Sequence, residues 1–318
     1  MRIKTLHIEF TTACNSRCVM CDYWKVNNNR RIDSDLVLSV VAEQVPLGLR
    51  KIYFTGGECL VFAEELFLLV KRIRDRFPSV KIGLITNGIL LKKYSREISA
   101  LFEKIIISLD TVDNETYRKV RGIDGVDVIR MGISQIKSQN PQIQVNLRVL
   151  VLNETVKGIP RIIEFAFEHN IDRVSFLSED TGNINAFGRG KGSIINNHIS
   201  NVSLLELRNI IDSIKVTYES ELGSLLRSDL YDLERIYSIY SGENVMFPKC
   251  DKPVASCVIG VDGRINPCFF IAGEQRITKE RKLSDILSDR VYCEYVNGIS
   301  AGLNVTCQNC ACPKELSE

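Results

Sequence analysis

The sequence predicts an α/β fold: a partial (β/α)6 barrel, similar to part of a TIM barrel, followed by a small cysteine-rich C-terminal domain. Six apolar runs rich in β-branched residues recur up to residue 177, and segments with helical periodicity lie between them. Strands that alternate with helices form parallel β/α units joined by right-handed crossovers. Six units are too few for a closed eightfold barrel, and the character of the chain changes after the sixth run.

The expected strands occupy, in chain order, residues 5–10, 51–57, 81–88, 104–111, 143–152 and 172–177. The clearest helical patterns, with a period near 3.6, lie at residues 33–45, 62–77 and 158–170, and two more helices are expected near 203–220 and 224–241. Residues 180–200 are polar and contain glycines, which favours a loop or linker. The expected domains are therefore a barrel at 1–185, a linker with capping helices at 186–244 and a cysteine-rich domain at 245–318, where "VDGRI" (261–265) reads as a hairpin turn.

Composition excludes several classes of protein. Hydrophobic residues make up 45% of the chain and charged residues 25%, which is ordinary for a globular protein. The net charge of +2 gives no bulk field that would attract nucleic acid or anionic lipid. No apolar run approaches the roughly 20 residues that cross a bilayer, and the N-terminus lacks a secretion signal. We therefore expect a cytoplasmic protein that binds neither nucleic acid nor membrane.

Eleven cysteines are the most informative feature of this composition. Disulfides are rare in a reducing compartment, so clustered cysteines indicate metal or redox chemistry. One group comprises Cys14, Cys18 and Cys21, directly after the first expected strand. Two more groups of three lie at 250–268 and 307–312, and only Cys59 and Cys293 stand alone.

The first group has three thiols where a closed metal site needs four. Thiolates select zinc, copper(I) or iron–sulfur clusters, and structural zinc takes four ligands. No residue near Cys14, Cys18 and Cys21 is an obvious fourth ligand. A [4Fe–4S] cluster bound by three cysteines leaves one iron with an open position, where a further ligand can attach. The spacing therefore predicts an open cluster.

The other short motifs fall at the same edge of the predicted sheet. "TGGE" follows the second expected strand, "TNG" the third, and "SLDT" closes the fourth. In parallel β/α folds the chemistry sits at the carboxyl ends of the strands. All of these motifs are thus expected on one rim, beside the cysteine loop.

These residues resemble a known family. Cys14-x3-Cys18-x2-Cys21 within "CNSRCVMCDYW", together with "GGE" at 56–58 and "SLDT", is similar to the signature of the radical S-adenosylmethionine (SAM) enzymes. The resemblance implies that the open iron binds SAM, and that one electron then releases a 5′-deoxyadenosyl radical, which abstracts a hydrogen atom from a substrate. It also implies an electron donor such as flavodoxin or ferredoxin as a partner.

The resemblance assigns SAM contacts residue by residue. The methionine amino group would be held by Gly56, Gly57 and Glu58. Ser108 and Asp110 would lie near the ribose, with Asn87 on the same rim. Arg121 would pair with the SAM carboxylate, because its planar fork suits a carboxylate, although Arg118 and Arg148 compete for this role.

The C-terminal cysteines resemble the twitch or SPASM extension of this family, which holds auxiliary clusters. Cys250-x17-Cys268 with Cys307-x2-Cys310 is spaced as in the twitch-domain aminocyclitol dehydrogenases. The candidate ligands are six in all: Cys250, Cys257, Cys268, Cys307, Cys310 and Cys312. Six are too few for two fully ligated clusters unless Cys293 joins, so we expect one auxiliary [4Fe–4S] cluster and two spare cysteines. A structural zinc site with four cysteines is the alternative.

The predicted function is a radical SAM oxidoreductase or epimerase that acts on a small polar molecule, such as a sugar or aminocyclitol. Cys59, next to "GGE", is either a hydrogen-atom donor, as in similar epimerases, or a small buried hydrophobic residue. One alternative is a peptide-modifying (RiPP) maturase that forms a crosslink or a D-residue, although the cysteine loop starts at residue 14 and leaves no room for a leader-binding domain. A non-catalytic zinc-binding adaptor is the other.

Overall fold

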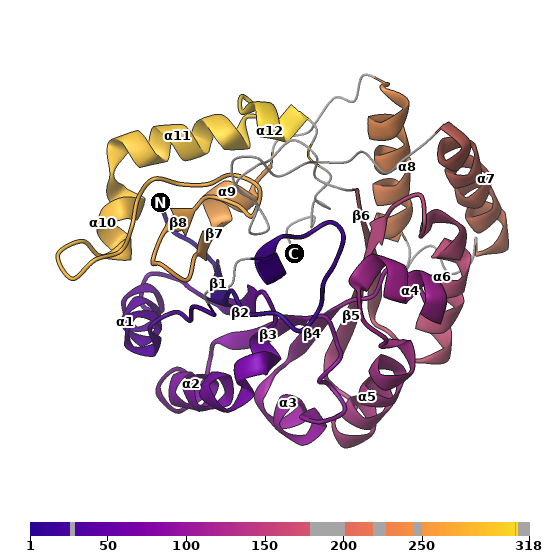
Figure 1. Ribbon diagram of the computed structural model, residues 1–318. Helices are drawn as coiled ribbons and strands as arrows, with labels where there is room; N and C mark the ends of the chain where they lie inside the picture. Colours follow the sequence, from indigo (N-terminus) through magenta and orange to yellow (C-terminus); the bar gives the residue numbers. More distant parts are fainter. Residues whose placement is uncertain (26–28, 179–200, 219–226, 244–249, 309, 311–318) are drawn as a thin grey trace.

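The computed structural model describes residues 1–25, 29–178, 201–218, 227–243, 250–308 and 310. Within them, eight strands form one sheet in the order β6–β5–β4–β3–β2–β1–β7–β8 (Figure 1). The strands are β1 (Thr5–Thr11), β2 (Lys51–Gly56), β3 (Lys81–Thr86), β4 (Lys104–Ser108), β5 (Gln144–Val151), β6 (Arg173–Ser178), β7 (Ser256–Ile259) and β8 (Ile265–Asn266).

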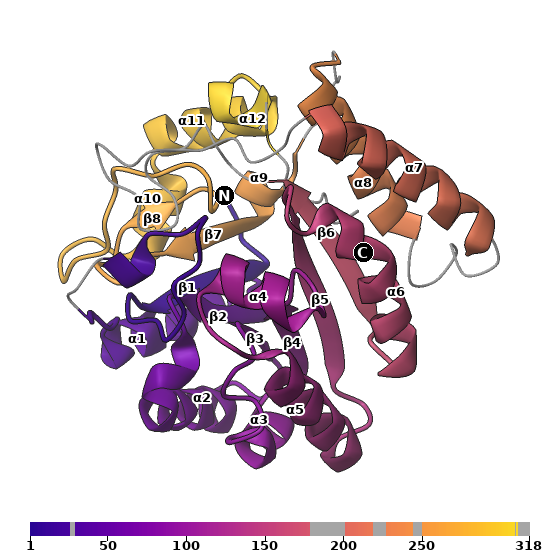
Figure 2. The same cartoon turned by 45° about the vertical axis from the view of Figure 1, so that its right-hand side comes forward.

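The barrel part is built from β1 to β6, each paired in parallel with the next along the chain. All six strands lie where the sequence predicts them. The sheet curves and helices cover its convex side, as in a partial barrel (Figures 1 and 2). The predicted fold class is confirmed, and the barrel is not closed, because β6 ends the sheet on one side.

The helices follow the apolar periodicity. Those of the barrel are α1 (Ser34–Gln44), α2 (Ala63–Arg76), α3 (Ser95–Leu101), α4 (Asn114–Arg121), α5 (Val126–Gln139) and α6 (Ile159–Glu168). They are followed by α7 (Asn201–Thr217), α8 (Arg227–Ser241), α9 (Lys252–Ala255), α10 (Leu283–Ser288), α11 (Arg290–Ser300) and α12 (Val305–Gln308). No helix among the described residues has the length and apolar character that a membrane crossing requires. The loop expected at 180–200 lies outside the described residues.

Alternation along each strand separates the hydrophobic core from an inner face. On β1, Leu6 and Ile8 are fully buried in the core beneath the helices. Successive residues point to opposite sides, so His7 and Glu9 face the concave side. There His7 stacks on Tyr53 of β2 with ring centroids 5.3 Å apart. Residues that pair across neighbouring strands lie on the same side of the sheet, so the pairings define the concave side as an inner face. Its polar residues include His7, Glu9, Tyr53, Thr55, Lys104, Ser108, Asn146, Arg148, Arg173 and Ser175.

The C-terminal segment continues the barrel sheet. β7 pairs in parallel with β1, with Thr5 opposite Ser256 and Ile8 opposite Ile259. β8 returns antiparallel to β7 through the expected hairpin turn, where Gly263 has a φ of 77° that favours glycine. The predicted boundary at residue 245 therefore divides the chain but not the sheet.

Candidate active site

The cluster loop, residues 12–22, lies between β2 and α4 at the carboxyl end of β1. On one side the backbone amide of Glu58 donates to the carbonyl of Ala13 at 2.7 Å. On the other side the amides of Arg17 and Val19 donate to the carbonyls of α4's last turn, each at 3.0 Å. The loop that carries Cys14, Cys18 and Cys21 is thus held by backbone hydrogen bonds from both flanks.

Two glycines allow β2 to come this close. A Cβ at Gly57 would lie 2.2 Å from the carbonyl oxygen of Ala13, and a Cβ at Gly56 would lie 2.4 Å from that of Thr11. No larger side chain fits at either distance. "GGE" therefore has a structural role next to any contact with SAM: it fixes the distance between the second strand and the cluster loop.

Glu58 joins β2 to β3 from a fully buried position. Its carboxylate accepts hydrogen bonds from the amide of Asn87 at 2.7 Å, the hydroxyl of Thr86 at 2.9 Å and the amide of Leu60 at 3.0 Å. Burial raises its pKa, and these three donors act in the opposite direction. Glu58 is placed at the rim as expected, while its contact with the methionine amino group stays a prediction.

Asn87 secures the cluster loop from β3. Its side-chain amide donates to the Oδ1 of Asn15 at 2.7 Å and to the hydroxyl of Ser16 at 2.9 Å. Asn15 and Ser16 lie between the first two cysteines, so this contact orients the loop on its inner side. Sequence reasoning placed Asn87 on the rim but missed its partners.

The three thiols lie close together in a partly desolvated place. Cys18 is buried and the other two are half-buried. Burial raises the pKa of Cys14 to about 11 and that of Cys21 to about 12, and the neighbouring thiols push in the same direction. Such a group favours a soft, positively charged metal centre that replaces the protons. Among the described residues no three His, Cys, Asp or Glu side chains already stand in metal-binding geometry. The three thiols fit a [4Fe–4S] cluster because they are soft donors and lie on one loop.

Asp110 and Arg121 form a buried ion pair. Asp110 is fully buried, and the Nε and Nη2 of Arg121 donate to its two carboxylate oxygens at 2.5 and 2.8 Å. The amide of Leu150 donates to the same carboxylate at 2.9 Å. The remaining Nη1 of Arg121 lies 3.8 Å from the sulfur of Cys18. This pair binds α4 to β4 and β5, and it occupies the guanidinium that the sequence assigned to the SAM carboxylate.

Arg148 is a second arginine near the carboxyl ends of the strands. It lies on the inner face, opposite Ser108 of β4 and Ser175 of β6. Its Nε is buried without a hydrogen-bond partner among the described residues. The structure thus separates the three arginines that competed in the sequence: Arg121 is committed to Asp110, Arg118 pairs with Asp124 on the surface, and Arg148 faces the barrel interior.

Cys59 points away from this interior. Its side chain is fully buried in the hydrophobic core, and its thiol donates to the carbonyl of Thr55 at 3.1 Å. Burial raises its pKa well above the usual range. The placement favours the packing role over hydrogen-atom donation, which stays an untested prediction.

The sequence model of the radical SAM superfamily matches residues 8–166, half of the 318-residue chain. The chain belongs to the radical SAM superfamily. Radical SAM enzymes use a [4Fe–4S] cluster and SAM, and the matched region contains the cluster loop, "GGE", Asn87 and the Asp110–Arg121 pair. The family predicted from the cysteine spacing is confirmed.

Curated relatives are GTP 3′,8-cyclases. That of Clostridium perfringens (strain SM101) is 31% identical over 179 residues, which are 54% of this chain and 54% of that protein. This chain spans about half the length of these curated relatives, for example 55% and 54% of two that are 31% identical to it. The GTP 3′,8-cyclase of Campylobacter jejuni subsp. doylei is 26% identical over 299 residues, 90% of this chain and 86% of that protein.

Solved radical SAM structures share the fold at low identity. Native anSMEcpe with bound AdoMet has a TM-score of 0.68 at 18% identity and covers 98% of this chain and 91% of its own. Streptococcus suis SuiB bound to SAM has a TM-score of 0.67 at 15% identity, over 93% and 68%. BtrN in complex with AdoMet and 2-DOIA has a TM-score of 0.52 at 15% identity, over 98% and 93%. These identities establish the fold alone.

Three C-terminal cysteines, Cys250, Cys307 and Cys310, lie near the end of α11, and Cys268 lies near Tyr295 of the same helix. Cys250 exchanges two hydrogen bonds with Ser300, its amide donating at 3.0 Å and its carbonyl accepting at 2.7 Å. The thiol of Cys307 lies 3.7 Å from the carbonyl of Ile299. Burial raises the pKa of Tyr295, and Cys268 and Cys307 add to this because they lie close to its phenol. Cys310 follows one turn after Cys307.

Two other cysteines of this region have different surroundings. Cys257 is fully buried in the core on β7, opposite Leu6 of β1, and burial raises its pKa to about 12. Cys293 on α11 donates its thiol hydrogen to the carbonyl of Leu287 at 3.2 Å. Cys312 lies outside the described residues. The ligand role predicted for Cys257 is untested, and its place in the core favours a spare cysteine.

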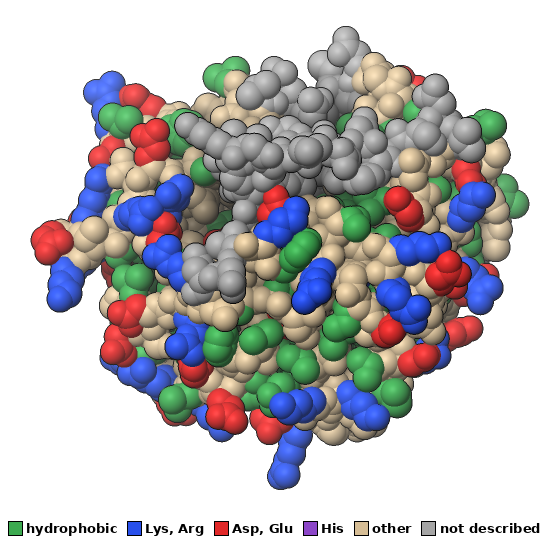
Figure 3. Space-filling view, in the orientation of Figure 1, with side chains coloured by type: hydrophobic (Ala, Val, Ile, Leu, Met, Phe, Trp, Pro, Cys, Tyr) green, Lys and Arg blue, Asp and Glu red, His purple; other side chains and the backbone are tan. Residues whose placement is uncertain are grey.

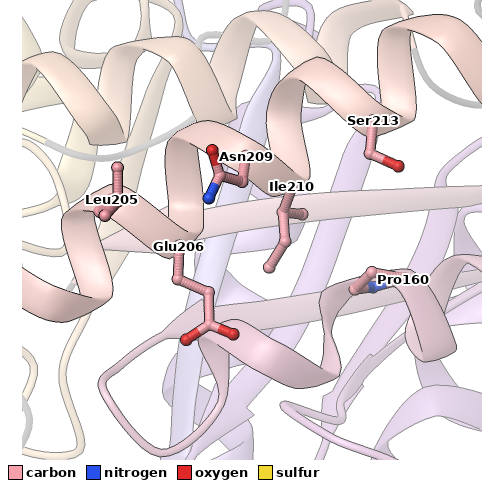
Figure 4. Close-up of a pocket in the computed structure, with 6 residues that line it drawn as sticks. All are labelled: Pro160, Leu205, Glu206, Asn209, Ile210 and Ser213. Atoms are coloured by element: carbon pink, nitrogen blue, oxygen red, sulfur yellow. The ribbon is translucent and has the colours of Figure 1, made fainter.

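The described surface carries side chains of both charges and a pocket away from the cluster loop. Lys and Arg side chains alternate with Asp and Glu on the face of Figure 3, in agreement with the balanced net charge. A pocket of about 380 Å³ opens between α6 and α7, lined by Pro160, Leu205, Glu206, Asn209, Ile210 and Ser213 (Figure 4). None of these residues belongs to the cluster loop, the rim or the cysteine group.

Proposed function

We propose that this radical SAM enzyme abstracts a hydrogen atom from a small polar substrate inside the barrel, leading to oxidation or epimerisation. The observation that carries the proposal is the polar inner face, which leads from the cluster loop into the barrel. A sugar or aminocyclitol offers hydroxyl and amino groups that match such a wall of donors and acceptors.

Side chains of the inner face near the cluster loop are positioned to contact a substrate. The hydroxyl of Tyr23, next to the cluster loop, donates to the carboxylate of Glu9 at 2.7 Å. A Cβ at Gly83 would lie 2.5 Å from the ring of Tyr53, so the glycine lets this ring lie across β3. Burial raises the pKa of Glu9, while Tyr23 acts in the opposite direction. Glu9 would thus supply a half-buried acceptor for a substrate hydroxyl or ammonium group.

Cys14, Cys18 and Cys21 would hold the cluster, with Gly56, Gly57 and Glu58 beside the methionine amino group. Arg148 now suits the SAM carboxylate better than Arg121 does, because Asp110 already occupies the Arg121 guanidinium. Ser108, which pairs with Arg148 across β4 and β5, would lie near the ribose. When bound, the cluster supplies the electron that cleaves the carbon–sulfur bond of SAM.

An auxiliary [4Fe–4S] cluster is part of the proposal. Cys250, Cys268, Cys307 and Cys310 would hold it, because the first, third and fourth lie near the end of α11 and Cys268 lies near Tyr295 of the same helix. Cys257 and Cys312 would be the spare cysteines. A second cluster could take up the electron that remains when a substrate loses a hydrogen atom and a proton.

A nucleotide is the second candidate substrate. The relatives named GTP 3′,8-cyclase support it, the Campylobacter protein over most of its length. Three cations of the inner face, Lys104, Arg148 and Arg173, would suit a phosphate chain. A peptide is the third, since SuiB is solved with its precursor peptide SuiA. Membership of an enzyme superfamily removes the support for a non-catalytic zinc adaptor.

An external electron donor and a reducing compartment complete the proposal. No disulfide joins the ten described cysteines to one another, which supports a reducing compartment such as the cytoplasm. A flavodoxin or ferredoxin would supply the electron.

Anaerobic reconstitution tests the proposal first. We expect about eight irons per chain in the wild type and about four in the Cys14/Cys18/Cys21→Ala triple variant, with matching sulfide. The wild type, and not the triple variant, should release 5′-deoxyadenosine from SAM under reduction. Turnover is then compared between aminocyclitols, GTP and peptides. Zinc instead of iron in both proteins would contradict the cluster assignment.

A further inference from the structure

Helix α8 carries two buried charges one turn apart. Asp232 is 2% exposed and Arg235 is 4% exposed, and each is followed by a buried apolar residue, Leu233 or Ile236. Charged side chains are almost never this buried unless something compensates the charge. The groups around Asp232 and Arg235 must therefore compensate their charges.

Arg235 contacts the auxiliary cysteine loop. Its Nη1 donates to the carbonyl oxygen of Cys310 at 2.6 Å. Asp232 faces three cations: Arg235 on its own helix, Arg173 on the inner face of β6, and Lys252 of α9. Lys252 lies two residues after Cys250. In Figures 1 and 2, α8 stands beside β6, on the side where the barrel sheet ends.

We propose that Arg235 is a positioning residue for the auxiliary cluster, and that Arg235 and Asp232 together set its reduction potential. This inference rests on the auxiliary cluster of the proposed function. Reduction adds a negative charge to a cluster that thiolates already make negative. A buried guanidinium nearby favours the reduced state, and a carboxylate beside that guanidinium opposes it. The two residues should therefore shift the potential in opposite directions.

A purely structural role predicts something else. If the charges only fasten α8 to the C-terminal segment, removing either one should loosen the cysteine loop. Both variants would then lose iron, and neither would shift the potential of the cluster that remains. The sign of the shift distinguishes tuning from fastening.

The experiment uses the Cys14/Cys18/Cys21→Ala triple variant, in which only the auxiliary cluster remains. Its midpoint potential is measured by EPR-monitored redox titration at pH 8, where Asp232, whose pKa burial raises to about 7, is mostly ionised. Arg235→Gln should lower the reduction equilibrium constant about tenfold, which for one electron is about 59 mV. Asp232→Asn should raise it by a similar factor, and Arg235→Lys should restore most of the lost potential.

Glu234→Gln is the matched control. It changes one charge on the same helix, but Glu234 pairs with Arg208 and Lys215 of α7 on another side of α8. The midpoint potential of the auxiliary cluster in this variant should equal that in the parent triple variant. If the triple variant folds poorly, the same titrations are made in the wild type, where added SAM identifies the signal of the other cluster.

The outcomes separate the two proposals. No iron in the triple variant, with the wild type holding about four, removes the auxiliary cluster and the inference with it. Iron present but potentials equal in Arg235→Gln, Asp232→Asn and the parent overturns the inference alone. Shifts of the same sign in both variants, or an equal shift in Glu234→Gln, also contradict it.

Discussion

At the scale of single residues, several polar side chains of the rim bind other parts of the protein and so fix the positions of the strands and loops around the site. Asp110 and Arg121 bind each other, and Glu58 accepts three hydrogen bonds from its own chain. Such satisfied, buried groups have fixed positions before any ligand arrives, which is what precise binding of SAM requires. Arg148, by contrast, lies on the inner face with its Nε buried and without a hydrogen-bond partner among the described residues.

Cys59 gives a prediction at this scale. Because its thiol lies in the core and donates to Thr55, we expect Cys59→Ala to keep both SAM cleavage and product formation. The lost sulfur should lower the free energy of unfolding by about 1–2 kcal/mol. Product and 5′-deoxyadenosine are measured together with a urea midpoint. Loss of product with intact SAM cleavage would instead restore the hydrogen-donor role.

Sequence patterns located the rim residues but not their partners. Asn87, Asp110 and Arg121 were all expected at the site because they follow strands or resemble a motif. That Asp110 takes the guanidinium of Arg121 depends on where α4 ends, at Gly122 with a φ of 68°. No spacing rule gives this geometry, because it depends on the packing of two β/α units.

At the scale of elements, the strands and helices were the easiest part to predict. Buried strands such as β4 are continuous apolar runs, and helices such as α6 repeat apolar residues at helical spacing, so burial is written into the local pattern. The pairing of β7 with β1 was not foreseen. It joins residues about 250 positions apart, and a four-residue strand carries too little pattern to name its neighbour.

The contact between β2 and the cluster loop gives the element-scale prediction. Gly57→Ala would place a Cβ 2.2 Å from the carbonyl of Ala13, so the loop must move away from β2. We expect a loss of about 1–3 kcal/mol in unfolding free energy and a several-fold lower iron content of the three-cysteine cluster. Iron analysis and urea unfolding measure the two effects.

Gly298→Ala is the control for this substitution. Gly298 lies within α11, and the nearest atom to its new Cβ would be 4.0 Å away, on Leu303. Alanine should leave iron unchanged and add up to about 1 kcal/mol through helix propensity. Equal iron in the two variants would show that the close approach of β2 does not position the loop.

At the scale of the whole molecule, one sheet runs through the barrel and the C-terminal segment. The amino terminus strengthens this connection, because Met1 donates to the carbonyl of Leu287 at 2.7 Å. The carboxylate of Glu43 on α1 also accepts a hydrogen bond from the amide of Ser284 at 2.8 Å. We therefore expect the two parts to unfold together, although the sequence suggested separate domains.

Val258→Pro tests this continuity. Val258 lies on β7 between two strands, opposite His7 of β1 and Asn266 of β8, and proline removes its amide donor and disrupts the ladder. Trp24, the single tryptophan, reports on the barrel, because its indole donates to the carbonyl of Cys18 at 3.1 Å. In the metal-free protein, urea unfolding followed by Trp24 fluorescence should coincide with far-UV circular dichroism, and both midpoints should fall.

Val291→Pro is the matched control in the same segment. Val291 is 73% exposed in the first turn of α11, where proline is tolerated, so its midpoints should stay close to those of the wild type. If Val258→Pro leaves the Trp24 transition in place while circular dichroism shows an early partial loss, the C-terminal segment unfolds by itself. The barrel and the C-terminal segment would then be two independent folding units that share one sheet. A change at the contact between α8 and the auxiliary cysteines would then leave the stability of the barrel unchanged.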